Sequence, residues 1–158
     1  MKRWQAGIGT AVLAASCAAP SQVAVKHIQT DSSAIATGVW AGDTYYLSGQ
    51  VASPVNEGKG APPEYGDTKA QAASVFAKIQ KLLQAQGLDM KDVVSMTVIM
   101  GPDPKTGKLD FAGMQSEYVK YFGTKEQPNK PARSAFQAAN LAAPWALLEV
   151  EVIAAKSK

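Results

Sequence analysis

Two segments with helical periodicity, separated by a run of β-branched residues, constrain the fold of this chain more than any other feature. The first helix is predicted to begin at Thr68, where Thr68 to Gln71 fits a capping box, and to end at a C-terminal cap at Gly87. The second is predicted to follow an N-cap at Asp110 and to end at Gly123. In both, apolar residues recur every three or four positions, so each helix buries one face. These residues are Ala72, Val75, Phe76, Ile79, Leu82 and Leu83 in the first helix, and Phe111, Met114, Tyr118, Tyr121 and Phe122 in the second.

The segments around the helices have the composition of β-strands. They are residues 23–28, 35–40, 44–48, 93–100, 134–139 and 146–155. The turn signal Ala41-Gly42-Asp43 predicts a hairpin, and the Pro- and Gly-rich stretch 53–65 predicts a surface loop. Strands, helix, strand, helix and strands in this order predict a single α+β domain, a mixed β-sheet with two helices on one face.

The other face of that sheet has no helix left to cover it. In the last predicted strand, Leu148, Val150 and Val152 alternate with Glu149, Glu151 and Ile153, so the two sets point to opposite faces. Because apolar side chains on the uncovered face would meet water, we expect another subunit to cover them.

The N-terminus has the three parts of a bacterial-type export signal: basic Met1-Lys2-Arg3, an apolar stretch at 6–15, and small residues at 16–19. About ten apolar residues are too few to cross a bilayer core, which takes roughly 20. We therefore expect residues 1–18 to be a signal peptide and residues 19–158 to form one domain, located in the periplasm or elsewhere outside the cytoplasm. A cytosolic protein with an apolar N-terminal tail is the alternative.

Two forms of export fit the residues around Cys17. Leu13 to Cys17 resembles a lipoprotein signal, in which Cys17 becomes the lipid-anchored first residue, although Ala14 stands where a large aliphatic residue is usual. Ordinary cleavage after Ala18 would instead remove Cys17. Only the first form attaches the protein to a membrane, and it needs more than one acyl chain for a stable anchor.

One His and one Cys among 158 residues exclude several kinds of site. A zinc site takes three or four ligands drawn mostly from these residue types, and a disulfide takes two cysteines, so neither is expected within one chain. His27 lies in a Val-rich stretch with no nucleophile motif nearby. Lys2 and Arg3 belong to the signal, and without them the net charge of +3 falls close to neutral, which argues against nucleic-acid binding.

Arg133 stands at the entrance to the predicted strand 134–139, and Glu149 lies in the next predicted strand, 146–155. If those strands form an antiparallel pair, the guanidinium and the carboxylate could meet across it. From the residues alone, a structural ion pair is the simpler interpretation, and a binding site is the alternative.

Several motifs together resemble the Rid family of reactive intermediate, or imine, deaminases. The resemblance runs from about Val25 to Ala155, and the motifs are Leu47-Ser48-Gly49-Gln50, Leu88 to Val94, Asp110-Phe111 with Glu117-Tyr118, Pro131 to Ser134, and Leu148 to Glu151. It implies a chorismate-mutase-like α+β fold and a homotrimer with clefts between subunits. It further implies hydrolysis of 2-imino acids to 2-keto acids and ammonia, without a metal or another cofactor.

By this resemblance, Arg133 would bind the substrate carboxylate, and Glu149 would hold or activate the attacking water. A guanidinium fork matches a carboxylate in a bidentate way that a lysine does not reproduce. The cleft would be lined by Ser48, Gly49, Gln115 and backbone groups at Ala135.

Three departures from the family pattern change the rim of this cleft. Ile35 stands where the family has a ligand-contacting tyrosine, and Gln115 stands where it has an asparagine. The segment between Arg133 and Glu149 is one residue longer than in the family, with the extra residue around 143–145, and the loop before Asp110 is also longer than in the family. A non-catalytic trimer that binds keto acids or other small carboxylates through Arg133 is therefore an alternative to imine hydrolysis. Endoribonuclease activity, reported for parts of the family, has no support from the charge or from a general-base histidine.

Overall fold

The computed structural model describes residues 22–56, 60 and 62–156. The predicted signal peptide and Cys17 lie outside these residues. The described chain forms six strands, two α-helices and one short 3-10 helix, η1. In chain order these are β1 (Val25–Ile28), β2 (Gly38–Ala41), β3 (Thr44–Gln50), α1 (Thr68–Gln84), η1 (Met90–Asp92), β4 (Val93–Met100), α2 (Phe111–Tyr118), β5 (Ala132–Gln137) and β6 (Leu148–Ala155).

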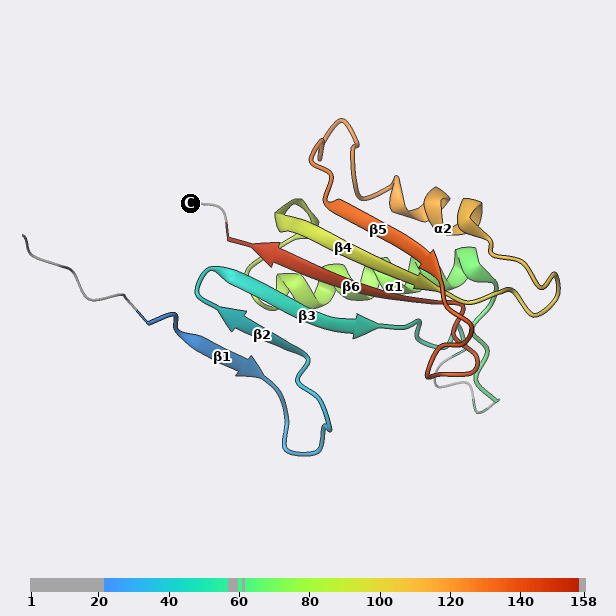
Figure 1. The fold of residues 1–158 in the computed structure, drawn as a ribbon, viewed down its shortest axis with the longest axis horizontal. Helices are drawn as coiled ribbons and strands as arrows, with labels where there is room; N and C mark the ends of the chain where they lie inside the picture. The colour runs from blue at the N-terminus through green and yellow to red at the C-terminus, as the bar shows by residue number, and fades with distance from the viewer. Residues whose placement is uncertain (1–21, 57–59, 61, 157–158) are drawn as a thin grey trace, which may run out of the picture.

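The strands form one mixed sheet in the order β1-β2-β3-β6-β4-β5 (Figure 1). All neighbours are antiparallel except β4 and β5, which run parallel. A parallel pair needs a long crossover connection, and the segment that contains α2 supplies it. The predicted hairpin of β2 and β3 and the predicted α+β class are both confirmed.

Both helices lie on the same face of the sheet, and the hydrophobic core fills the space between the two layers (Figure 1). Along β6, Leu148, Val150, Val152 and Ala154 are fully or almost fully buried, whereas Glu149 and Glu151 point to the other face. The helix residues Phe76, Ile79 and Met114 are completely buried against this layer. The arrangement predicted from the periodicity, two helices on one face, is confirmed.

The ends of α1 differ in part from the prediction. The N-cap is Asp67, whose side chain accepts a hydrogen bond from the Ala70 N–H at 2.8 Å, so the predicted capping box at Thr68 is wrong. A carboxylate one residue earlier competes better for the free amides of the first turn. Gly87 has a φ of 74°, and the Leu88 N–H donates to the Leu83 carbonyl at 3.0 Å, so the predicted glycine cap is confirmed.

Helix α2 begins where the sequence predicts and ends earlier. Asp110 is its N-cap and accepts a hydrogen bond from the Gly113 N–H at 2.8 Å. The helix ends at Tyr118, and the chain continues in tight turns as far as Gly123, whose φ is 73°. Tyr118 and Phe122 are buried as predicted, but Phe111 is 41% exposed and lies beside the Arg133 guanidinium.

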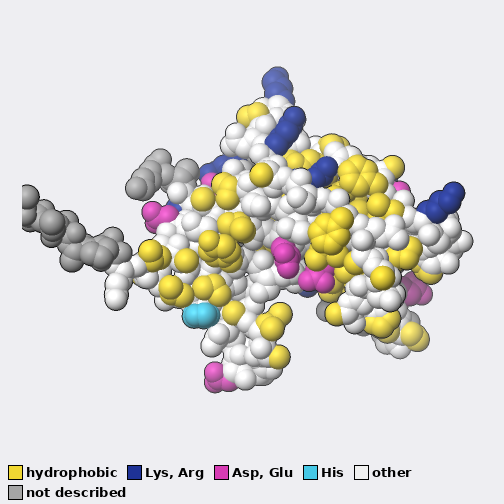
Figure 2. Space-filling model, viewed as in Figure 1, with side chains coloured by type: hydrophobic (Ala, Val, Ile, Leu, Met, Phe, Trp, Pro, Cys, Tyr) yellow, Lys and Arg dark blue, Asp and Glu magenta, His cyan; other side chains and the backbone are white. Residues whose placement is uncertain are grey.

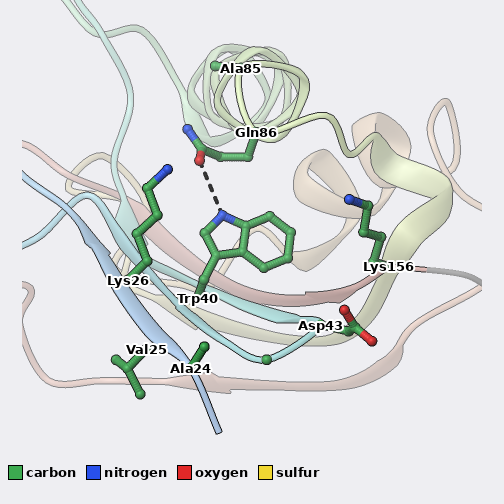
Figure 3. A pocket seen from close by; sticks show the side chains of 9 residues that line it. Ala24, Val25, Lys26, Trp40, Asp43, Ala85, Gln86 and Lys156 are labelled. Carbon is green, nitrogen blue, oxygen red and sulfur yellow. Dashed lines mark hydrogen bonds between the residues drawn. The ribbon is translucent and has the colours of Figure 1, made fainter.

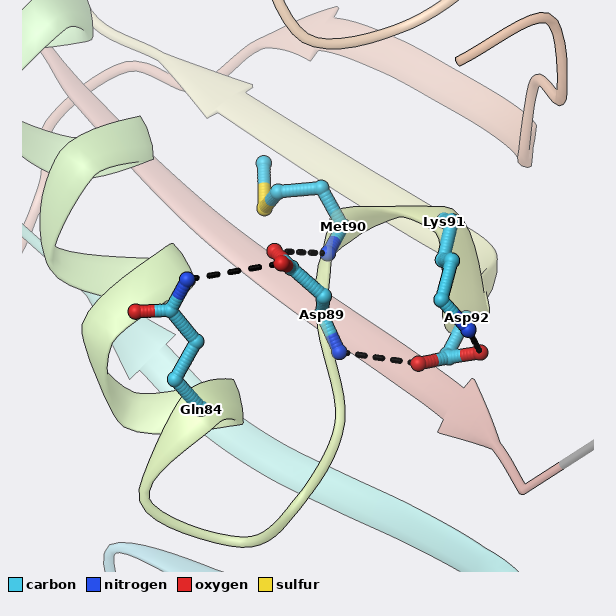
Figure 4. Close-up of polar contacts among 5 residues, drawn as sticks. All are labelled: Gln84, Asp89, Met90, Lys91 and Asp92. Atoms are coloured by element: carbon cyan, nitrogen blue, oxygen red, sulfur yellow. Dashed lines mark hydrogen bonds and ion pairs between the residues drawn. The ribbon is translucent and has the colours of Figure 1, made fainter. Parts of the chain in front are cut away.

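Asp89 organises the connection between α1 and β4 (Figure 4). Its carboxylate accepts hydrogen bonds from the Met90 N–H and from the Gln80 and Gln84 amides, while the Asp92 carboxylate accepts from the Asp89 N–H. Burial disfavours the charged form of Asp89, but these hydrogen bonds and the attraction of Lys91 outweigh it and hold its pKa below the ordinary value.

We expect Asp89→Ala to destabilise the fold by about 1 kcal/mol at neutral pH, because it removes an N-cap. Since the folded-state pKa of Asp89 is lowered, its stabilisation is complete above the unfolded-state value of about 4 and is lost as the pH falls through the folded-state value. Urea titrations of both proteins at pH 7 and pH 3 measure this. A stability difference as large at pH 3 as at pH 7 would contradict the ionic role of Asp89.

The long connections before α1, α2 and β6 lie together at one end of the sheet (Figure 1). The buried Gln71 of α1 connects this helix to the segment before β6. Its amide nitrogen donates to the Trp145 carbonyl at 3.1 Å, and its amide oxygen accepts from the Leu147 N–H at 2.9 Å. The Trp145 ring stacks on Tyr65 with 3.6 Å between ring centroids. The loop that carries the extra residue is therefore fixed to the core by specific contacts.

The face of the sheet opposite the helices is uncovered in the single chain. Tyr46 is 47% exposed and Phe136 is 50% exposed on this face, and Figure 2 shows hydrophobic side chains spread over the strands with acidic groups among them. The predicted uncovered apolar face is thus present. Among the described residues, no helix is long and apolar enough to cross a membrane.

Candidate functional site

Arg133 lies on β5, on the helix side of the sheet. It is paired with the buried Met96 of β4, so both side chains point towards the helices. The guanidinium carbon is 4.1 Å from the centroid of the Tyr118 ring and 5.7 Å from that of Phe111. This stacking orients the guanidinium plane without using its N–H donors.

The guanidinium opens into a pocket of about 480 Å³ between α2 and the start of β5. Its Nη1 is buried and has no hydrogen-bond partner among the described residues, and the same is true of the Gln115 Oε1 in the same pocket. Unpartnered buried polar atoms are rare in folded proteins, because each costs about 1–3 kcal/mol. Arg133 and Gln115 therefore each bring a buried polar atom without a hydrogen-bond partner to the wall of this pocket.

Tyr118 completes the floor under Arg133. Burial raises the pKa of its phenol, and the positive charge of Arg133 offsets this only in part. The ring is consequently neutral at physiological pH, and it presents a π-face to the cation and carries no charge that would compete for it.

Glu149 lies on β6 on the opposite face of the sheet, in register with Ile99 of β4. Its carboxylate rests against Gly49 of β3, where a Cβ would overlap Oε1. Between Leu47 and Gln50, β3 carries one more residue than β6, so a β-bulge contains Ser48 and Gly49. The bulge and the missing side chain together make room for the carboxylate.

The residues around Glu149 come from β3 and from the loop before β2. The Ser48 hydroxyl donates to the Ala36 carbonyl at 2.7 Å, and the Gln50 amide donates to the Ser48 carbonyl at 2.9 Å. Ile35, the residue next to Ala36, is 68% exposed. Ser48, Gly49, Glu149 and Ile35 therefore belong to one neighbourhood, and the Ser48 hydroxyl oxygen remains available as an acceptor.

The prediction that Arg133 and Glu149 could meet across an antiparallel pair is wrong. Strand β4 lies between β5 and β6, and the two side chains point to opposite faces. The predicted site residues thus form two half-sites in one chain. Arg133, Gln115 and Ala135, whose partner Val98 faces the core, belong to the helix side. Ser48, Gly49 and Glu149 belong to the open face.

Residues that sequence reasoning assigned to the core also contribute to the Arg133 half-site. Phe111 and Tyr118 were expected only as parts of an apolar stripe, and they stack on the guanidinium. Their spacing from Gln115, four residues back and three forward, places all three on one side of α2. From this spacing, the sequence alone could have placed the two aromatic rings beside Gln115.

A larger hollow lies elsewhere, beside the indole of Trp40 (Figure 3). It measures about 510 Å³, and the Trp40 Nε1 donates to the Gln86 amide oxygen at 3.2 Å. Lys26, Asp43 and Lys156 surround it, but none of the predicted site residues does. Within residues 22–56, 60 and 62–156, no group of three His, Cys, Asp or Glu side chains is placed to hold a metal ion.

A mixed sheet with two helices on one face is the chorismate-mutase-like α+β fold. In this chain the Arg133 half-site lies on the helix side of the sheet and the Glu149 half-site on its open face. Residues 21–156 match the family described as Endoribonuclease L-PSP, and the chain belongs to that family.

The relatives bear names that fit the resemblance to Rid proteins. A RutC family protein of Haemophilus influenzae is 33% identical over 115 residues, which cover 73% of this chain and 81% of the relative. The 2-iminobutanoate/2-iminopropanoate deaminase of Rattus norvegicus is 30% identical over 139 residues, which cover 85% of this chain and 92% of the relative. The crystal structure of RidA from an Antarctic Psychrobacter superposes with a TM-score of 0.63 at 31% identity, covering 83% of this chain and 99% of that one. The predicted Rid membership and fold are confirmed.

Proposed function

We propose that this protein hydrolyses 2-imino acids to 2-keto acids and ammonia. The observation that carries the proposal is the Arg133 half-site: a guanidinium stacked on Tyr118 that lines an open pocket and forms no ion pair with the described residues. Such a group suits the planar carboxylate that every 2-imino acid carries. Relatives with imine deaminase names support the same reaction.

The complete site is formed by two subunits in this proposal. Arg133 and Glu149 face away from each other within one chain, so a substrate that touches both needs a second copy. A homotrimer whose uncovered sheet faces meet its neighbours would bring the Glu149 half-site of one subunit to the Arg133 half-site of the next. The exposed Tyr46 and Phe136 support burial of this face.

The chemistry then requires only positioning and proton transfer. Arg133 binds the carboxylate, and Glu149 accepts a proton from a water molecule as its oxygen bonds to the imine carbon. The protonated Glu149 returns that proton to the nitrogen of the resulting carbinolamine. Glu149 then takes the hydroxyl proton of the carbinolamine and passes it to the same nitrogen, so the carbon–nitrogen bond breaks, ammonia leaves, and the carbonyl of the keto acid forms. The imine carbon is already electrophilic, so no covalent nucleophile is needed.

We also propose that the protein acts outside the cytoplasm, on the strength of the export signal at residues 1–18. Its substrates would then come from an oxidase that releases imino acids in that compartment. The two forms of export differ in whether Cys17 is kept with a lipid anchor or removed. Mass spectrometry of the mature N-terminus distinguishes them.

Ammonia release from 2-iminopropanoate, generated by an amino-acid oxidase, tests the proposed reaction. We expect the wild-type protein to accelerate release over buffer and Arg133→Ala to lose about 100-fold of that acceleration. Equal rates for wild type, Arg133→Ala and buffer would refute hydrolysis.

Binding without turnover is the second candidate, because each chain holds the carboxylate-binding half-site but not the water-activating one beside it. Calorimetry with pyruvate separates the two: binding through Arg133 in a protein that does not accelerate ammonia release would select it. An RNA substrate is disfavoured by the near-neutral charge of the chain without its signal. Intact RNA at low salt would exclude that activity.

A further inference from the structure

The Arg133 pocket contains a second cation, Lys130. Both residues line it, together with Gln115, Tyr118, Val119, Phe122, Gly123 and Pro131, and no acidic side chain is among these lining residues. The alkyl stem of Lys130 lies across Gly123, where a Cβ would overlap the Lys130 Cε. Because Gly123 has a φ of 73°, the same glycine both ends the α2 turns and gives the lysine its path.

Neither cation is neutralised within the described part of the chain. The ion pairs there join Lys91 to Asp92 and Lys120 to Glu117, so the buried Glu117 of α2 is already occupied. Two unpaired positive charges around one pocket of about 480 Å³ attract a ligand with two negative charges. A simple monocarboxylate would satisfy Arg133 and leave Lys130 unused.

We propose that the pocket selects dicarboxylic substrates, the 2-imino derivatives of acidic amino acids. The inference rests on the proposed function and specifies its substrate class. Arg133 binds the carboxylate next to the imine carbon, and the ammonium of Lys130 binds the distal carboxylate. Lys130 is thus a specificity-determining residue and takes no part in proton transfer.

Calorimetry with two stable product analogues tests this selection. 2-Oxoglutarate carries the distal carboxylate, and 2-oxopentanoate has a methyl group in its place. We expect the full-length protein to bind 2-oxoglutarate about tenfold more tightly, as one added charge-assisted contact provides. We expect Lys130→Gln to lose this preference while its affinity for 2-oxopentanoate stays the same. Lys125→Gln removes the same charge outside the pocket lining and should retain the preference.

The outcomes separate the substrate class from the function beneath it. If wild type binds both oxo acids equally, or if Lys130→Gln keeps the tenfold preference, the dicarboxylate assignment is overturned while imine hydrolysis stands. If neither compound binds and Arg133→Ala changes nothing, the proposed function itself fails. Loss of the preference in Lys125→Gln would show a general charge effect and would also overturn the assignment.

Discussion

On the proposed function, co-assembled Arg133→Ala and Glu149→Gln subunits should recover deaminase activity well above that of either variant alone. Each parent lacks one half of every site, so we expect each to retain about one hundredth of the wild-type acceleration. The reason for recovery is geometric: the two side chains lie on opposite faces of one sheet, separated by β4. A hybrid can combine an intact Arg133 from one subunit with an intact Glu149 from the next.

The expected size of the recovery follows from the composition of a hybrid trimer. In a trimer that contains both kinds of subunit, one of the three sites combines an intact Arg133 with an intact neighbouring Glu149, so the isolated hybrids should reach about one third of the wild-type acceleration. Co-expression with two affinity tags isolates the hybrids, and the coupled oxidase assay measures ammonia release.

Hybrids of Arg133→Ala with the Arg133→Ala/Glu149→Gln double variant serve as the control, because they contain no intact arginine and should stay inactive. Hybrid assemblies confirmed by mass that remain at the level of the parents would show that the site does not form between subunits.

The elements that sequence alone predicted best are those fixed by local chemistry. Val93–Met100 forms a strand at the predicted residues because a β-branched run ends at Gly101-Pro102. Asp110 caps α2 because its carboxylate reaches an amide three residues away, within the same turn. Such signals depend on residues close in sequence, where hydrogen bonds and steric limits leave few alternatives.

The pairing of β5 could not be predicted in this way. Two consecutive strands usually suggest a hairpin, but β5 runs parallel to β4, and β6 inserts on the other side of β4. That order depends on the α2 crossover and on core packing between segments distant in sequence. The placement of Arg133 and Glu149 on one antiparallel pair failed for this reason, although both residues remain the centres of the two half-sites.

Gly49→Ala should reduce kcat by about 100-fold, because a misplacement of roughly 1 Å at a reacting group has an effect of this size. A Cβ at this position overlaps the Glu149 Oε1, so the carboxylate has to leave its place on the bulge. The backbone of Gly49 lies outside the positive-φ region, so alanine fits its conformation and the effect acts on Glu149 alone. Affinity for pyruvate should not change, since the Arg133 half-site is untouched.

Two comparisons make the Gly49→Ala prediction specific to the carboxylate. Gly101→Ala is the matched control: a Cβ there meets its nearest atom, the Ala146 carbonyl oxygen, at an ordinary 3.5 Å, so activity should be retained. In a Glu149→Gln background, whose activity is already low, Gly49→Ala should cost little more, because the two changes act on the same group. A further tenfold loss in that background would mean that Gly49 contacts the substrate directly. The steady-state kinetics of the wild type, Gly49→Ala, Glu149→Gln and the double variant decide between a glycine that positions the proposed catalytic glutamate and one that lines the cleft.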